Sequence, residues 1–169
     1  MPDKSQAGDN PADKAKGAGT AGGAQTAQSG TAPSEAAFGQ AVWLMMNMPQ
    51  LRHVFLADLE WMVLPPIMLN QYRLLKVGNR IVAFAAWAFL SEAVEARLQE
   101  TGPRLAPGEW KSGDRLWLIS LFAPFGHQDV MIADLRATAL AGKTFKLHRR
   151  GADGKASVEV LTGAPVGKA

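Results

Sequence analysis

The chain has 169 residues, of which 47% are hydrophobic, so its length and composition suit one domain with a buried core. The absence of cysteine excludes disulfide bonds, cysteine-ligated zinc and a thiol nucleophile, and a net charge of +3 is too small to indicate a nucleic-acid partner. No apolar run approaches the ~20 residues that cross a bilayer, so we expect no stable membrane insertion.

Residues 1–33 are mostly small or polar, since the first aromatic residue is Phe38 and no Leu, Ile or Val precedes Val42. Ordering such a segment costs backbone entropy and buries little apolar surface. We therefore predict a disordered tail rich in alanine and glycine. The segment also lacks the apolar stretch of a secretory signal, which favours a cytoplasmic location.

The predicted domain covers residues 34–162 and begins where Ser34 is suited to cap a helix. That helix has apolar residues at core spacing and ends before Pro49. Residues 52–64 show a second helical pattern, which we expect Pro65 and Pro66 to stop.

An antiparallel hairpin is predicted next, with strands at residues 71–77 and 80–90 around a Gly-Asn turn. Because the second strand is apolar on both faces, it should lie in the centre of the sheet. Ser91 is then suited to cap a helix that turns Val94 and Leu98 inward.

After a loop, residues 115–124 indicate a buried strand and residues 126–140 an amphipathic helix. A second hairpin is predicted over residues 143–162, and residues 163–169 are expected to be frayed. This order of elements predicts a mixed α/β fold, with a central, mostly antiparallel sheet flanked by helices.

Four segments of the domain carry a further signal: LPPIMLNQYRLL, AFAAWAFLSEAVEARL, WKSGDRLWLI and APFG. In this order and spacing they resemble the RTX toxin-activating lysine acyltransferases, from about Trp43 to the end of the domain. The resemblance implies a fold like that of the GNAT acyltransferases. It also implies an enzyme that takes a fatty acyl group from acyl carrier protein and attaches it to internal lysines of an RTX-type protoxin.

The family's chemistry uses a histidine and an aspartate. A lysine side chain has a pKa of ~10.4, so its acylation at neutral pH needs a base, and a carboxylate can orient an imidazole for that role. By the resemblance, Asp114 matches the family's aspartate. The alternative for Asp114 is a turn residue that caps its own backbone or pairs with Arg115.

Leu51 occupies the place of the family's histidine, and His53, two residues later, is the candidate replacement base. If residues 51–53 are extended, the two side chains point to one side about 7 Å apart. If these residues are helical, the side chains diverge by about 200°, and His53 is a solvated residue at a helix start. Two functions stay open: a lysine acyltransferase, and a non-catalytic relative that binds acyl carrier protein or a toxin-like partner.

The other histidines, His127 and His148, are expected to be surface residues, and the sequence predicts no metal site. A single glycine in APFGHQD makes a poor cradle for a pyrophosphate, so we expect no cofactor and acyl carrier protein rather than coenzyme A as the donor. A homodimer is left open.

Two larger sets have alternative interpretations. A basic set is either a docking face for the acidic carrier protein or a soluble sheet edge, and an aromatic set either lines an acyl channel or is plain core. The basic set is Lys143, Lys146, Arg149, Arg150 and Lys155, and the aromatic set is Trp43, Phe55, Trp87, Phe89, Trp117 and Phe122.

Overall fold

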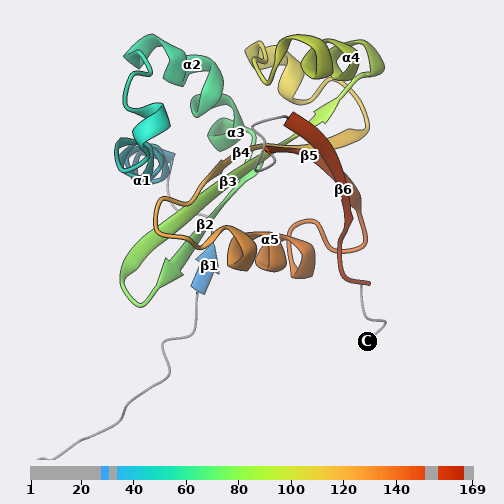
Figure 1. The fold of residues 1–169 in the computed structure, drawn as a ribbon. Helices are drawn as coiled ribbons and strands as arrows, with labels where there is room; N and C mark the ends of the chain where they lie inside the picture. Colours follow the sequence, from blue (N-terminus) through green and yellow to red (C-terminus); the bar gives the residue numbers. More distant parts are fainter. Residues whose placement is uncertain (1–27, 31–33, 151–155, 166–169) are drawn as a thin grey trace, which may run out of the picture.

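The fold is seen in a computed structural model that describes residues 28–30, 34–150 and 156–165 (Figure 1). Within these ranges six strands form one sheet in chain order, and every neighbouring pair is antiparallel except β4 and β5. The strands are β1 (Gln28–Gly30), β2 (Tyr72–Val77), β3 (Arg80–Leu90), β4 (Arg115–Phe122), β5 (Thr144–Arg150) and β6 (Ala156–Thr162). The predicted fold class, a mixed α/β domain with a mostly antiparallel sheet, is confirmed.

Helices cover both faces of the sheet. In Figure 1, α1 to α4 lie over one face and α5 lies against the other. The helices are α1 (Ser34–Met46), α2 (Leu59–Met62), α3 (Leu64–Met68), α4 (Glu92–Thr101) and α5 (Gln128–Ala137), with 3₁₀ turns η1 (Pro49–Leu51), η2 (Leu56–Asp58) and η3 (Pro107–Trp110). None of the helices in the described ranges has the length and apolar composition that crossing a bilayer requires.

The β2–β3 hairpin turns at Gly78, whose φ of 59° suits a residue without a Cβ. From Ala83 to Leu90, successive residues of β3 belong to the two opposite cores, because side chains alternate across a strand. Phe84 and Ala86 pack under α1 to α4, whereas Ala85 and Trp87 face α5. The prediction that β3 is a central strand, buried on both faces, is confirmed.

Two predictions about helices have different outcomes. Ser91 caps α4 as predicted, since its side chain accepts a hydrogen bond from the backbone N–H of Val94. The single helix predicted for residues 52–64 is wrong: the chain forms η2 and the four-residue α2 there. Pro65 and Pro66 do not stop a helix but lie in the first turn of α3, where a missing N–H costs no helical hydrogen bond.

Five residues of the predicted tail and C-terminal end make backbone contacts with the domain. β1 pairs with β2, and backbone pairing at a sheet edge needs no large side chain. At the other end, Gly163 N–H donates to Lys143 O at 2.8 Å and Ala164 N–H donates to Arg136 O at 2.7 Å. The rest of these two predictions concerns residues 1–27, 31–33 and 166–169, which lie outside the described residues.

The junction between β4 and β5 is narrow, with only two residue pairs, Trp117↔Lys146 and Leu118↔Leu147. A buried carboxylate on α4 reinforces it: Glu95 Oε1 accepts hydrogen bonds from Trp117 Nε1 at 2.5 Å and Lys146 Nζ at 2.9 Å. Arg115 Nε lies 3.2 Å from the other carboxylate oxygen, close enough for an ion pair but not aligned for a hydrogen bond. Side chains therefore join the two halves of the sheet where the backbone ladder is short.

Candidate functional site

Asp114 lies in the loop just before β4 and is exposed. Among the described residues its side chain makes no hydrogen bond and no ion pair, so the alternative in which Asp114 caps its own backbone or pairs with Arg115 is not formed. Arg115 instead pairs with Glu92 at 2.9 Å and with Glu95. An unengaged, exposed carboxylate is available to an external partner.

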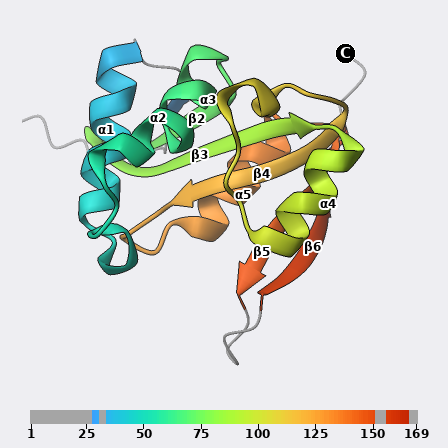
Figure 2. The same ribbon diagram turned by 90° about the horizontal axis from the view of Figure 1, so that it is seen from above.

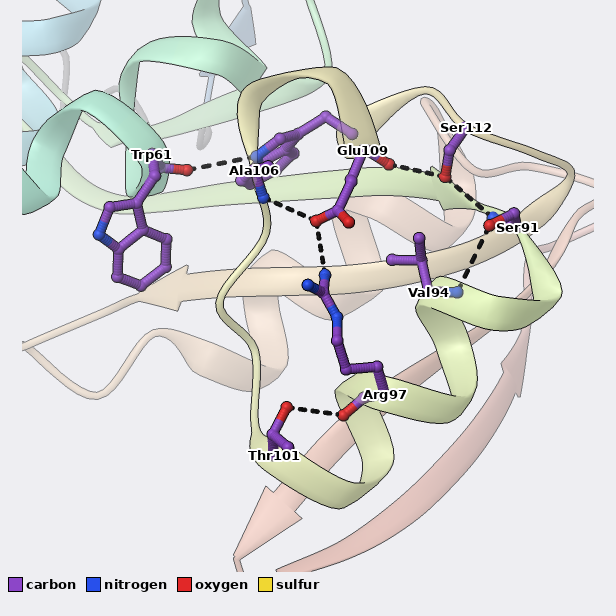
Figure 3. A network of polar contacts seen from close by, with 9 residues as sticks. Trp61, Ser91, Val94, Arg97, Thr101, Ala106, Glu109 and Ser112 are labelled. Atoms are coloured by element: carbon purple, nitrogen blue, oxygen red, sulfur yellow. Dashed lines mark hydrogen bonds and ion pairs between the residues drawn. The ribbon is translucent and has the colours of Figure 1, made fainter.

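The residues beside Asp114 hold its loop against α4 (Figure 3). The Ser112 hydroxyl accepts a hydrogen bond from Ser91 N–H at 3.0 Å and donates to Glu109 O at 2.9 Å. Gly113 has no room for a side chain, because a Cβ there would lie 2.4 Å from Leu90 O. Ser112 and Gly113, two residues of the family-like segment, therefore have structural roles. The sequence alone did not distinguish these roles from catalytic ones.

The same network ties η3 to α4 and α2. The carboxylate of Glu109 accepts hydrogen bonds from Ala106 N–H at 2.7 Å and from Arg97 at 2.5 Å, and Trp110 Nε1 donates to Trp61 O at 3.2 Å (Figure 3). Burial acts to raise the pKa of Glu109, but these two donors and the charge of Arg97 outweigh it and hold the pKa below its usual value. The loop that carries Asp114 is thus firmly positioned.

Leu51 ends the 3₁₀ helix η1 and His53 lies in the turn that follows, so residues 51–53 are not extended. η1 ends at Leu51, and Val54 N–H donates to Leu51 O at 3.2 Å, a contact between residues three apart that closes a tight turn. Leu51 is half-buried against the core under α1 to α3, whereas His53 is exposed. His53 therefore does not occupy the space that a side chain at position 51 fills.

The structure does not bring His53 and Asp114 together. Trp43 of α1 packs against Phe125, which follows the end of β4, and Figure 2 shows the turns between α1 and α2 beside that end of the strand. Asp114 precedes the start of β4, and a strand of eight residues is about 26 Å long. The two predicted catalytic residues thus lie near opposite ends of β4.

His127 and His148 are more buried than predicted. His127 is half-buried just before α5, and its Nδ1 has no hydrogen-bond partner among the described residues. The His148 ring packs 5.1 Å from the Trp117 ring, and burial lowers the pKa of His148. The prediction of a solvated face is wrong for His148, because the fold partly covers its ring.

Part of the basic set is neutralised within the chain. Lys146 pairs with Glu95 at 2.9 Å and Arg149 with Glu159 at 2.5 Å, while Lys143 lies 5.6 Å from the centre of the Phe89 ring. Lys155 and the side chain of Arg150 lie outside the described residues. Under the docking-face alternative, this surface would offer fewer unpaired cations than the sequence suggests.

The aromatic set divides between core and surface. The alternative that the set is plain core holds for three buried side chains, those of Trp87, Trp117 and Phe122. Trp43 and Phe55 are exposed, at 41% and 78%. Phe89 is partly buried, so Trp43 and Phe55 are the members of the set that a ligand reaches most easily.

A cleft lies beside Leu51, between the end of α1 and the start of α2, with a volume of about 380 Å³. It is lined by Val42, Met45, Met46, Leu51, Arg52, Val54, Leu56 and Leu59. Elsewhere in the described part of the chain, no three His, Asp or Glu side chains gather as metal ligands would. Leu51, which the resemblance matches to the family's histidine, therefore lines a largely apolar cleft.

The model of the RTX toxin acyltransferase family matches residues 31–163, which include α1 to α5 and β2 to β6. The chain belongs to this family. The resemblance described from its four sequence segments is thereby confirmed.

Three relatives illustrate the range of the family. The chain is 40% identical over 98 residues to a leukotoxin-activating lysine-acyltransferase of Aggregatibacter actinomycetemcomitans, which covers 58% of each chain. It is 37% identical over 94 residues to a protein-lysine palmitoyltransferase of Bordetella bronchiseptica, 56% of this chain and 51% of the relative. An uncharacterized Synechocystis protein is 36% identical over 102 residues, 59% of this chain and 69% of the relative. The chain thus spans little more than half the length of the two named acyltransferases.

Proposed function

We propose that this protein transfers a fatty acyl group to lysine side chains of an RTX-type protoxin. The observation that supports the proposal most directly is the family match, which includes the helices on both faces of the sheet and five of its six strands. Two of the relatives described above are named as acyltransferases that act on lysine. A shared domain of this extent supports a shared reaction.

The proposed donor is the acyl thioester of acyl carrier protein. The neutral lysine amine attacks the thioester carbonyl, the carbon–sulfur bond breaks, the carrier thiol leaves and an amide forms. The proton lost from the ammonium passes to a base and then to solvent. No covalent intermediate on a protein thiol is needed, which suits a chain without cysteine. Between β4 and α5 the stretch 123–127 contains one glycine, Gly126, so the sequence offers no glycine-rich pyrophosphate loop for coenzyme A.

His53 and Asp114 are the proposed catalytic groups. Because they lie near opposite ends of β4, the proposal does not require that the carboxylate orient the imidazole. His53 is exposed on a turn, between two residues of the cleft's lining, Arg52 and Val54, and an exposed imidazole can take a proton from a lysine of an approaching protein. Each residue is therefore tested by its own substitution.

A second candidate function is favoured by one observation: at the family's base position, Leu51 packs half-buried in apolar surroundings and cannot accept a proton. Under this alternative the chain binds acyl carrier protein or a toxin-like partner without catalysis. The two candidates differ in whether any lysine becomes acylated.

The deciding experiment incubates the full chain with palmitoyl-loaded acyl carrier protein and an RTX-type protoxin, and measures acylated lysine by mass spectrometry. The variants are His53→Ala, Asp114→Ala and Leu51→His, with Asp129→Ala as a matched control for an exposed aspartate. Acylation by the wild type that falls at least about tenfold in His53→Ala supports the proposal, since general-base catalysis contributes roughly 100-fold or more.

Other outcomes separate the alternatives. A silent wild type with activity gained in Leu51→His supports the non-catalytic relative. Activity that survives in both His53→Ala and Asp114→Ala keeps the acyltransferase but removes these two residues from its mechanism. Silence of the wild type and of Leu51→His, both folded by circular dichroism, overturns the proposed reaction.

A further inference from the structure

The residues that line the cleft beside Leu51 range from buried to exposed. Its floor is made by Met45 and Leu59, which are 4% and 6% exposed. Leu51 and neighbouring valines form half-buried sides, and Met46 and Leu56 form a rim that is 62% and 80% exposed. A surface that runs from buried floor to exposed rim is an open groove rather than a packing defect in the core.

The groove offers few polar groups to a ligand. Arg52 is the one charged residue of its lining, and its Nε donates to Met46 O at 3.3 Å, which leaves the end of the guanidinium exposed at the rim. The nearby carboxylate of Asp58 accepts hydrogen bonds from Phe55 N–H and Trp61 Nε1. A polar ligand would lose its hydrogen bonds to water here without finding partners, which is unfavourable.

We propose that this groove binds a linear fatty acyl chain, with the polar head of the chain beside Arg52. The proposal rests on the proposed function, which supplies the class of ligand. The volume of about 380 Å³ falls within the roughly 300–1,000 Å³ of ligand sites, which are mostly apolar with a few polar groups at defined places. Exposed apolar side chains gathered around a groove are also typical of binding surfaces.

The proposal gives the leucine at position 51 a physical role. A histidine there would place two ring nitrogens on the side of the groove, where the lining offers no acceptor or donor side chain except Arg52. Leucine instead adds an apolar side chain to a lining that also contains Val42 and Val54. Leu51 is therefore a residue of the acyl-chain site.

The test measures displacement of a fluorescent C16 fatty acid from the full chain by palmitate and by S-palmitoyl-pantetheine. Leu56→Asp puts a carboxylate on the exposed rim without removing core atoms, and Leu51→Trp fills the side of the groove. Met68→Asp is the matched control, because Met68 is 71% exposed and lies outside the groove. We expect Leu56→Asp to weaken binding of both ligands by about tenfold or more and Met68→Asp by less than about twofold.

The two ligands separate the sources of the acyl chain. Arg52→Gln should weaken palmitate, which carries a carboxylate, more than the uncharged thioester. Equal binding by wild type, Leu56→Asp and Leu51→Trp would overturn the proposal. So would adsorption to phosphatidylcholine vesicles without binding of monomeric palmitate, which would make the rim a lipid-surface contact.

The result is distinguishable from failure of the proposed function. Acyl binding that is lost in Leu56→Asp, in a protein that acylates no lysine, leaves the acyl site standing and removes the enzyme. Acylation that continues unchanged in Leu56→Asp and Leu51→Trp leaves the enzyme standing and removes the acyl site.

Discussion

Glu95→Ala should destabilise the domain strongly, because Glu95 is the only carboxylate that meets Trp117, Lys146 and Arg115 in the described structure. The Glu95 side chain is 11% exposed and Trp117 is fully buried, so the alanine variant leaves the indole N–H without an acceptor and Lys146 without its counter-charge, while Arg115 keeps its ion pair with Glu92. Removing one partner of a buried charge pair costs about 3–5 kcal/mol.

The lower end of that range applies here. Lys146 and Arg115 are 37% and 33% exposed, so water screens part of the lost attraction. We therefore expect a loss of about 3 kcal/mol in the free energy of unfolding, which lowers the melting temperature by about 10 °C in a domain of this size.

Urea unfolding followed by tryptophan fluorescence, and thermal unfolding followed by circular dichroism, would measure this loss. The matched control is Glu92→Ala on the same helix, whose side chain is 84% exposed although it also pairs with Arg115. The control should change stability by less than about 0.5 kcal/mol. A Glu95→Ala variant as stable as Glu92→Ala would refute the reasoning.

The pH dependence gives an independent check. Burial acts to raise the pKa of Glu95, but hydrogen bonds from Lys146 and Trp117 and the charges of Lys146 and Arg115 outweigh it and lower the pKa below its ordinary value of 4.5. Because the folded pKa is the lower one, this contribution to stability is present above pH 4.5 and is lost as the pH falls through the folded pKa. Glu95→Gln should lack this part of the acid destabilisation.

Three further predictions concern single side chains. Gly113→Ala should destabilise the fold by about 1–3 kcal/mol in urea unfolding, because the new Cβ would lie 2.4 Å from Leu90 O. Gly108→Ala, with open space around it, should cost less than half as much, and equal losses would contradict this explanation. Gln71→Leu should cost about 2 kcal/mol by the same assay, since Gln71 Nε2 donates to two backbone carbonyls in the buried interior, at 2.9 and 3.0 Å. If the variant is as stable as the wild type, these carbonyls find other donors. Burial lowers the pKa of His148, so the free energy of unfolding should fall as the pH drops below 6.5, the ordinary value at which the unfolded chain takes up the proton. The stability of His148→Phe should fall less between pH 7 and 5, and parallel curves for both proteins would show that His148 is not the cause.

The sheet was predictable because its signals are local. The Gly-Asn turn and the continuous apolar run of β3 define a hairpin and a central strand without knowledge of the rest of the chain. The backbone pairing of β1 was not predictable, because it depends on the open edge of β2 rather than on side chains of residues 28–30.

The candidate site was harder to predict from sequence. Spacing along the chain shows that Leu51 and His53 are two residues apart, but the tight turn that buries one and exposes the other depends on packing under α1. Likewise, the segment around Asp114 has a family pattern in which structural residues such as Gly113 and residues suited to chemistry stand side by side. Only the three-dimensional structure shows that β4 separates Asp114 from His53.

The short ladder between β4 and β5 divides the sheet into two units of different cooperativity. The β5–β6 hairpin has seven residue pairs of its own but is held to β4 by two. Segments with few cross-connections open at lower free energy than the rest of a fold, so amides of the hairpin are expected to exchange with deuterium in one step, ahead of those in β3. The rate at which the β4–β5 junction opens is then set mainly by side-chain contacts. Substitution of a single residue at this junction would change that rate and leave the ladder of β2, β3 and β4 intact.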